Sequence, residues 1–290
     1  MIMNNNKIIL MISFARSGAT LLNRCLGSLS NVVIMSEVNP LGGGWGEKKE
    51  KSPTTIKTQA KQWYNISLKS NGFCEEALEL ASICKKQKKH LIIRDWSYVN
   101  FVPHEYNNFN PPNRLLSYEQ LKGKCHLVAF AFIRDSIDVW ISRNTPPVKE
   151  FYKQYSKYID EILKNNIKIF KYENFCQNPD LEMKEICRYI GIEYSSAYKN
   201  YNKFTNVNGD IQNGCKSRGI KQQKISLLPR KEIPFNKIKE INTCLEMKRV
   251  NSLLGYKTSY YKNQIDKILI IIKKIIKIKT ILKNYFSKYG

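Results

Sequence analysis

Short runs of apolar residues recur along the chain, and longer segments with helical periodicity separate them. Five of these runs are apolar on both faces, which is typical of strands buried in a parallel sheet. They cover residues 7–14, 31–35, 90–94, 126–133 and 167–172. The alternation of strands and helices predicts an α/β domain with three layers, in which helices cover both faces of a mainly parallel central sheet.

Boundary signals flank two of the helical segments. Asn178 and Pro179 are typical cap and first-turn residues, and the apolar stripe that follows them closes at Gly191. A last helical pattern stops at Gly255, because glycine commonly ends a helix. We therefore expect one compact domain over residues 1–256.

Two stretches fit this alternation less well. Residues 41–89 contain three consecutive glycines in a polar stretch and end in a Lys-rich helical pattern. We expect an insertion over the carboxyl edge of the sheet or a region that contacts the acceptor. Residues 257–290 are rich in Ile and Lys and predict a basic amphipathic helical tail. Such a helix can lie on an anionic membrane surface, pair with a partner or pack on its own domain.

The chain is strongly basic. Its 290 residues include 48 Lys and Arg against 24 Asp and Glu, which gives a formal net charge of +24. A charge of this size favours anionic partners such as nucleic acid, polysaccharide, anionic lipid or a phosphorylated cofactor. Only ten of the basic residues are Arg, and the Lys residues accompany abundant Asn and Ile, a bias that genomic base composition also produces.

The spacing of the cysteines and the hydropathy of the chain indicate in which cellular compartment the protein resides. The eight cysteines are scattered without a CxxC pair, so a reducing, cytosol-like compartment is expected. The N-terminus lacks the order of residues that marks a signal peptide, and no apolar run reaches the roughly 18–20 residues of a membrane-spanning helix. We predict a cytoplasmic protein, with peripheral contact to a membrane through the tail as the alternative.

The segment that joins the first strand to a helix has the pattern of a phosphate loop. A strand, a small-residue turn and a helix together cradle phosphate, because free amides at the helix N-terminus face the anion. Against the Walker pattern GxxxxGK[ST], Gly18 and Thr20 match, Ser13 replaces the first glycine and Ala19 replaces the lysine. Without that lysine, hydrolysis of ATP or GTP is disfavoured.

Residues 14–22, FARSGATLL, resemble the [PF]-x-[RK]-S-G-T-T-x-L loop of sulfotransferases, which binds the 5′-phosphosulfate of 3′-phosphoadenosine 5′-phosphosulfate (PAPS). The resemblance implies that the cofactor contacts come from Arg16, Ser17, Gly18, Ala19 and Thr20. Ala19 stands where the family usually has Thr, so a hydroxyl contact is absent there while the backbone amides remain. The alternative interpretation is that the loop is an ordinary strand-to-helix turn with a solvated arginine.

A second motif follows the strand at 126–133. Arg134 ends this strand, and Ser142 lies eight residues later on the next predicted helix. A guanidinium at a strand end and a hydroxyl on the following helix can converge on one phosphate. Sulfotransferases hold the 3′-phosphate of PAPS with an Arg and a Ser at this spacing, so the resemblance implies that role for Arg134 and Ser142.

Two weaker matches follow in the same order as in the family. Tyr172 lies in KYENF, which resembles the family's Y-E-D segment, whose Tyr contacts the adenine, although an aromatic residue at a strand end also packs in cores. Ser217 and Arg218 resemble the late R-x-G loop that folds over the 3′-phosphate. The resemblance spans most of residues 7–256 and implies the sulfotransferase version of the P-loop fold, of the bacterial or tyrosylprotein-sulfotransferase type.

Sulfuryl transfer to a hydroxyl requires a base and positive charge where the leaving bisphosphate develops its charge. Glu37 follows the second strand, 21 residues after Arg16, and tyrosylprotein sulfotransferases carry their catalytic Glu at this separation. Asp95, after the third strand, is the alternative base. Glu37 is equally explained as a helix cap or a surface ion pair, and Asp95 as a partner of Arg94.

These features predict a PAPS-dependent sulfotransferase with metal-free, in-line transfer. In it Glu37 removes the acceptor proton, and Arg16 stabilises the departing adenosine 3′,5′-bisphosphate (PAP). The acceptor is a hydroxyl or amine on a carbohydrate, a phenol or tyrosine, or a small metabolite, and the sequence does not select among them. Two other functions stay open: a kinase-like phosphoryl transferase, and a non-catalytic basic module for nucleic acid or anionic membrane. No nucleic-acid motif is recognisable.

Overall fold

The computed structural model describes residues 4–42, 54–103, 110–208 and 224–260, together with 272, 275, 278 and 279. Five parallel strands form one sheet in the order β2-β3-β1-β4-β5. They are β1 (Asn4–Ser13), β2 (Val32–Val38), β3 (His90–Asp95), β4 (Cys125–Ile133) and β5 (Lys168–Lys171). The five strands predicted from apolar runs are therefore confirmed.

The side chains of β1, the central strand, are buried on both faces of the sheet. Ile8, Leu10 and Ile12 point into one core cluster, whereas Ile9 and Met11 point into a second cluster on the opposite face. Successive side chains of a strand alternate between faces, so a strand covered on both sides needs an uninterrupted apolar run. The three-layer α/β arrangement predicted from the sequence is confirmed.

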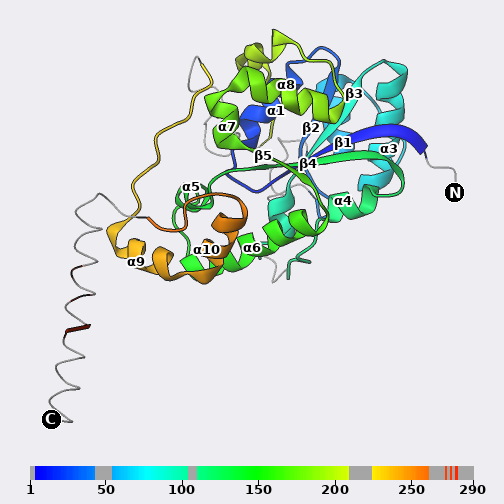
Figure 1. Ribbon diagram of the computed structural model, residues 1–290. Coiled ribbons are helices and arrows are strands. Elements are labelled where there is room, and N and C mark those ends of the chain that lie inside the picture. The colour runs from blue at the N-terminus through cyan, green and yellow to red at the C-terminus, as the bar shows by residue number, and fades with distance from the viewer. Residues whose placement is uncertain are drawn as a thin grey trace.

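Helices cover both faces of the sheet (Figure 1). One core cluster receives side chains from α1 (Ala19–Gly27), α7 (Tyr172–Gln177), α8 (Pro179–Ile190) and the 3-10 helix η2 (Ser196–Lys203). The other cluster receives them from α2 (Ile56–Tyr64), α3 (Phe73–Lys86), α4 (Leu116–Leu121), α5 (Ser136–Ser142), α6 (Val148–Lys164), α9 (Phe235–Thr243) and α10 (Leu245–Leu253). A 3-10 turn, η1 (Ser97–Asn100), follows β3.

Helix α8 has the boundaries that its sequence signals predict. It begins with Pro179 and ends at Gly191, whose φ of 62° lies in the left-handed region that favours glycine. The last helical pattern differs from the expectation in one respect. It is divided at Cys244, whose extended backbone separates α9 from α10.

The described part of residues 41–89 forms two helices, and the expectation of an insertion or acceptor-side region at the carboxyl edge stays a prediction. Helices α2 and α3 link β2 to β3 and pack on strands of the sheet. Helix α2 also covers β2, the edge strand. The buried amide of Gln59 accepts a bond from Ser36 N and donates one to Ser36 O, each at 2.7 Å, and Tyr64 bonds to the backbone of Ile34. These contacts satisfy edge groups that would otherwise remain open for pairing.

The compact fold continues past residue 256, where we expected it to end. Tyr260 is 6% exposed, its backbone bonds to both polar atoms of the Asn242 side chain, and its hydroxyl accepts a bond from Asn251. Residues 257–260 thus belong to the domain. Within the described ranges, no helix is both long and apolar enough to cross a membrane.

Candidate functional site

The site begins at the loop between β1 and α1, at the carboxyl end of the central strand. Gly18 lies at the N-terminus of α1 with φ 85°, no side chain caps this end, and the first turn contains no acidic residue. The first amides of α1 therefore remain available to an anion. The Ser17 hydroxyl is buried and has no hydrogen-bond partner among the described residues. Ala19 and Thr20 form the start of the helix.

Arg16 links this loop to helix α5. Its side chain is exposed, and its Nε donates to Ser142 O at 2.9 Å and to Ser142 Oγ at 3.1 Å. Ser142 is the last residue of α5, the helix that follows β4. The structure therefore brings together two residues, 126 positions apart, that the sequence motifs assigned separately to the two ends of the cofactor.

Arg134 and Tyr172 form the second contact between the two motifs. The Arg134 guanidinium lies 4.8 Å from the centroid of the Tyr172 ring, an arrangement typical of a cation–π contact. The ring also covers Gly18, because a Cβ added to that glycine would lie 2.3 Å from Tyr172 Cδ2. Tyr172 is buried between the phosphate loop and Arg134, and its predicted contact with adenine stays a prediction.

Arg134 is held in place but its hydrogen-bonding capacity is not used up. Its Nη2 lies 3.5 Å from Asp138 Oδ2, one helical turn further on. Its Nε is buried without a partner in the part of the chain that the structure describes. A buried, unpaired donor of this kind costs about 1–3 kcal/mol, which an anion bound beside Arg134 would offset.

Glu37 lies at the end of β2, where the pairing with β3 shifts register between Ser36 and Val38. Its Oε1 accepts a bond from Arg94 Nη2 at 2.6 Å, and its side chain is 23% exposed. Within the described ranges, Oε2 has no hydrogen-bond partner. Arg94 thus pairs with Glu37, and the predicted alternative pairing of Arg94 with Asp95 is wrong.

Asp95, the alternative base, is 1% exposed. Its carboxylate accepts bonds from Asn39 at 2.8 Å, Ser97 at 2.5 Å and Ser117 at 2.6 Å. Burial raises the pKa of Asp95, and the three hydrogen bonds oppose part of that rise. Of these two carboxylates, Glu37 therefore reaches solvent and Asp95 does not.

Arg143 and Tyr98 are site residues that the sequence patterns did not single out. Arg143 Nη2 lies 2.5 Å from the Tyr98 hydroxyl, and the guanidinium lies 4.4 Å from the Tyr98 ring centroid and 5.8 Å from that of Phe14. Burial lowers the pKa of Arg143, and its contact with Tyr98 opposes this. The only available signal was that Arg143 directly follows Ser142.

Two predicted residues cannot be placed, since Ser217 and Arg218 lie outside the described residues. The same is true of the stretch from 43 to 53. Among the residues that are described, no group of three or more His, Cys, Asp or Glu is placed to bind a metal ion.

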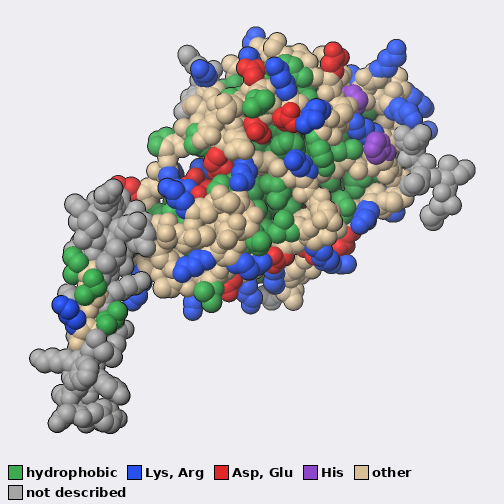
Figure 2. Space-filling view, in the orientation of Figure 1, with side chains coloured by type: hydrophobic (Ala, Val, Ile, Leu, Met, Phe, Trp, Pro, Cys, Tyr) green, Lys and Arg blue, Asp and Glu red, His purple; other side chains and the backbone are tan. Residues whose placement is uncertain are grey.

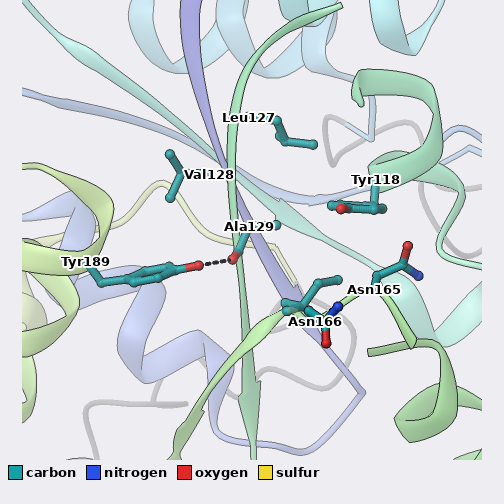
Figure 3. Close-up of a pocket in the computed structure, with 8 residues that line it drawn as sticks. Tyr118, Leu127, Val128, Ala129, Asn165, Asn166 and Tyr189 are labelled. Carbon is teal, nitrogen blue, oxygen red and sulfur yellow. Dashed lines mark hydrogen bonds between the residues drawn. The ribbon is translucent and has the colours of Figure 1, made fainter. Parts of the chain in front are cut away.

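A cavity of about 280 Å³ lies beside the first half of β4, away from the carboxyl end of the strand (Figure 3). Tyr118, Tyr189 and Asn165 line it, and the Tyr189 hydroxyl donates to Ala129 O at 2.9 Å. This part of β4 lies toward the start of the strand, whereas Arg134 follows the end of it. The cavity is therefore separate from the phosphate loop.

The architecture defines a class: a parallel α/β domain in which a loop joins the central strand directly to the uncapped N-terminus of the first helix. No family profile matches the chain, and no curated protein sequence matches it. Among the solved structures that share its fold are two sulfotransferase domains. The sulfotransferase domain from the curacin biosynthetic pathway has a TM-score of 0.56 and 13% identity, over 87% of this chain and 98% of that domain. The sulfotransferase domain of the Synechococcus PCC 7002 olefin synthase has a TM-score of 0.55 and 15% identity, over 88% and 96%. The chain has the sulfotransferase fold, as the loop motif predicts.

Proposed function

We propose that this protein is a sulfotransferase that moves the sulfuryl group of PAPS to a hydroxyl or amine acceptor. The observation that supports this most directly is the convergence of the two sequence motifs. Arg16 of the loop bonds to Ser142 of α5, and Arg134 contacts Tyr172, which covers Gly18 of the loop. The site thus offers positive charge and open amides from two elements to one extended anion.

The donor set fits PAPS in its chemistry. The buried Ser17 hydroxyl and the Arg134 Nε each lack a partner among the described residues, and phosphate oxygens would supply acceptors for both. On the family's pattern, the loop from Arg16 to Thr20 would hold the 5′ side, and Arg134 with Ser142 the 3′-phosphate. When bound, PAPS supplies an activated sulfuryl group.

The chain's own residues would carry the transfer as follows. Glu37 Oε2 would accept the proton that the acceptor hydroxyl or amine loses when it takes up the sulfuryl group. Arg94 holds the other oxygen of that carboxylate and fixes its orientation. Arg16 and the amides of α1 would stabilise the charge that develops on the leaving phosphate.

The decisive experiment is calorimetric titration with PAP in the absence of metal. We expect the wild-type protein to bind, and Arg134→Ala to bind roughly 10- to 100-fold more weakly, because a hydrogen bond to a charged group contributes about 1.5–3 kcal/mol. Arg188→Ala is the control, since that exposed side chain pairs with Glu185 on α8 outside the site. Absence of PAP binding, or preference for ATP with Mg²⁺, would refute the proposal.

The acceptor belongs to the same proposal. Carbohydrates, phenols including tyrosine, and small alcohols or amines are the candidate classes. A screen that follows transfer of radiolabelled sulfate from PAPS to each class would identify it. The screen also separates catalysis from binding, because a non-catalytic PAP-binding protein labels no acceptor.

A further inference from the structure

Two carboxylates lie beside the arginine that we assign to the 3′-phosphate. Asp135 caps the N-terminus of α5 through a bond from Ile137 N, and Asp138 lies in the first turn of the same helix. Both are buried, and Asp138 Oδ2 is 3.5 Å from Arg134 Nη2. A carboxylate so close to an anion site opposes anion binding, since it repels the ligand and competes for the cation.

Arg230 bridges these two carboxylates. Its Nε donates to Asp138 Oδ1 at 2.6 Å and its Nη2 to Asp135 Oδ2 at 2.5 Å. The ring of Tyr260 lies 5.1 Å from the same guanidinium. Arg230 therefore stands in a fixed geometry, although it lies 92 residues from Asp138 in the sequence and belongs to no helix or strand.

The distances show which of the two arginines, Arg230 or Arg134, binds Asp138 more closely. It is held tightly by Arg230, at 2.6 Å, and only loosely by Arg134, at 3.5 Å. Arg134 keeps a buried Nε without a partner in the described part of the chain. The stronger pair leaves the guanidinium of Arg134 oriented but still able to bind an anion.

We propose that Arg230 is a positioning residue of the anion site, which holds Asp138 away from Arg134 so that Arg134 can bind the 3′-phosphate. The inference rests on the proposed function. Without Arg230, Arg134 becomes the nearest cation to Asp138, the two close into a tighter pair, and the ligand has to break that pair. The site also gains an uncompensated negative charge.

A double-mutant cycle tests this role. The variants are Arg230→Met, Asp138→Asn and the double variant, each titrated with PAP and with adenosine 5′-phosphate, which lacks the 3′-phosphate. We expect Arg230→Met to weaken PAP binding roughly 10- to 100-fold and adenosine 5′-phosphate binding less than about 3-fold. The double variant should return to within about 3-fold of Asp138→Asn, because the competing carboxylate is gone.

Arg249→Met is the matched control. Arg249 forms a two-bond pair with Asp160, at 2.7 and 2.9 Å, between α10 and α6 and outside the anion site. Its loss should leave the affinity for PAP unchanged. If Arg230→Met fails to fold, Arg230→Lys replaces it, since lysine keeps the charge but cannot bridge both carboxylates. That variant should weaken PAP binding about 3- to 10-fold.

Several results would overturn the inference. Unchanged PAP affinity in a folded Arg230→Met would exclude a positioning role and leave the sulfotransferase proposal intact. A loss that Asp138→Asn does not rescue would mean that Arg230 contacts the phosphate itself. Equal losses for the two nucleotides would indicate a purely structural role. Failure of the wild type to bind PAP would refute the proposed function and this role together.

Discussion

At the scale of single residues, Arg16 and Glu37 have backbone conformations that their residue types disfavour. Their φ angles are 75° and 54°, in the left-handed region where a non-glycine residue costs about 1–2 kcal/mol. Each is held there by its side chain, Arg16 by Ser142 and Glu37 by Arg94. Strain of this kind clusters at functional sites, where tertiary contacts rather than local preference determine the position of a side chain.

The assignment of the base can be tested at this scale. Glu37→Gln should lower turnover by at least about 100-fold, as expected for loss of a general base, while the affinity for PAP stays unchanged. Turnover is measured by transfer of labelled sulfate and affinity by calorimetry. A variant Glu37→Gln with wild-type turnover, together with a folded but inactive Asp95→Asn, would transfer the role to Asp95.

Ionisation of Asp95 should instead change the free energy of unfolding with pH. Burial raises its pKa in the folded state above the usual value of 3.8, so the folded protein binds this proton more tightly than the unfolded chain does. The contribution of this group to the free energy of unfolding is fully present below pH 3.8. It is lost as the pH rises through the raised pKa of the folded state. Asp95→Asn cannot ionise, so the advantage of wild type over this variant should shrink as pH increases. Urea unfolding of both proteins at several pH values measures this, and a difference independent of pH would contradict it.

At the scale of elements, the phosphate loop depends on Gly18. Gly18→Ala should destabilise the protein by about 2–4 kcal/mol, because a Cβ would lie 2.3 Å from the Tyr172 ring and φ is 85°. Gly123→Ala is a matched control, with φ 77° but no atom within 4 Å of the added Cβ. Thermal unfolding of the two variants separates the cost of the backbone from that of the clash. Equal effects would mean that Tyr172 does not restrict the loop.

Helix α8 is tied at its start to the segment that follows its end. Asp180 accepts a bond from Tyr194 at 2.7 Å and pairs with Lys199 at 2.9 Å, and these contacts lower its pKa from 3.8 to about 2. The stabilisation is present above pH 3.8 and is lost as pH falls toward 2. Because the pair is exposed, we expect Asp180→Asn to cost only about 0.5 kcal/mol at pH 7 and progressively less as the pH falls toward 2.

Glu182 provides the control for this prediction, since it lies on the same helix but burial raises its pKa. Urea unfolding of Asp180→Asn and Glu182→Gln between pH 2 and 7 should therefore give pH dependences of opposite sign. Parallel curves would show that the contacts of Asp180 do not contribute to stability.

Elements differ in how well the sequence predicts them. The five strands and α8 were predictable because apolar runs and helix caps are local signals. The role of α2 was not predictable. From the sequence alone Gln59 is an ordinary polar surface residue, and only the structure shows that it bonds to the edge of β2. Likewise, Arg16 and Arg134 stand in recognisable motifs, whereas the link from Arg230 to Asp138 joins residues 92 positions apart and no local pattern encodes it.

At the scale of the whole molecule, the net charge is +24, but the basic side chains do not form a single stripe on the visible face. Figure 2 shows Lys and Arg spread over it, with Asp and Glu between them. A dispersed charge supports solubility and general attraction to anions more than it supports a dedicated polyanion groove. Cytoplasmic localisation and contact of the tail with a membrane stay predictions, which vesicle co-sedimentation of the full chain would test.

The boundary of the domain gives the last prediction. A chain ending at residue 256 loses Tyr260, which is buried and bonds to Asn242, Asn251 and Asp135, whereas a chain ending at 260 keeps all these contacts. Loss of a buried aromatic side chain costs about 3–5 kcal/mol, so the shorter chain should melt roughly 6–20 °C below the longer one. Tyr260→Phe in the chain of 260 residues separates the hydroxyl bonds from the packing of the ring. Equal melting temperatures for the two truncated chains would place the end of the stable domain at 256, and would also remove Tyr260 from the contacts that hold Asp135 and Arg230 beside the anion site.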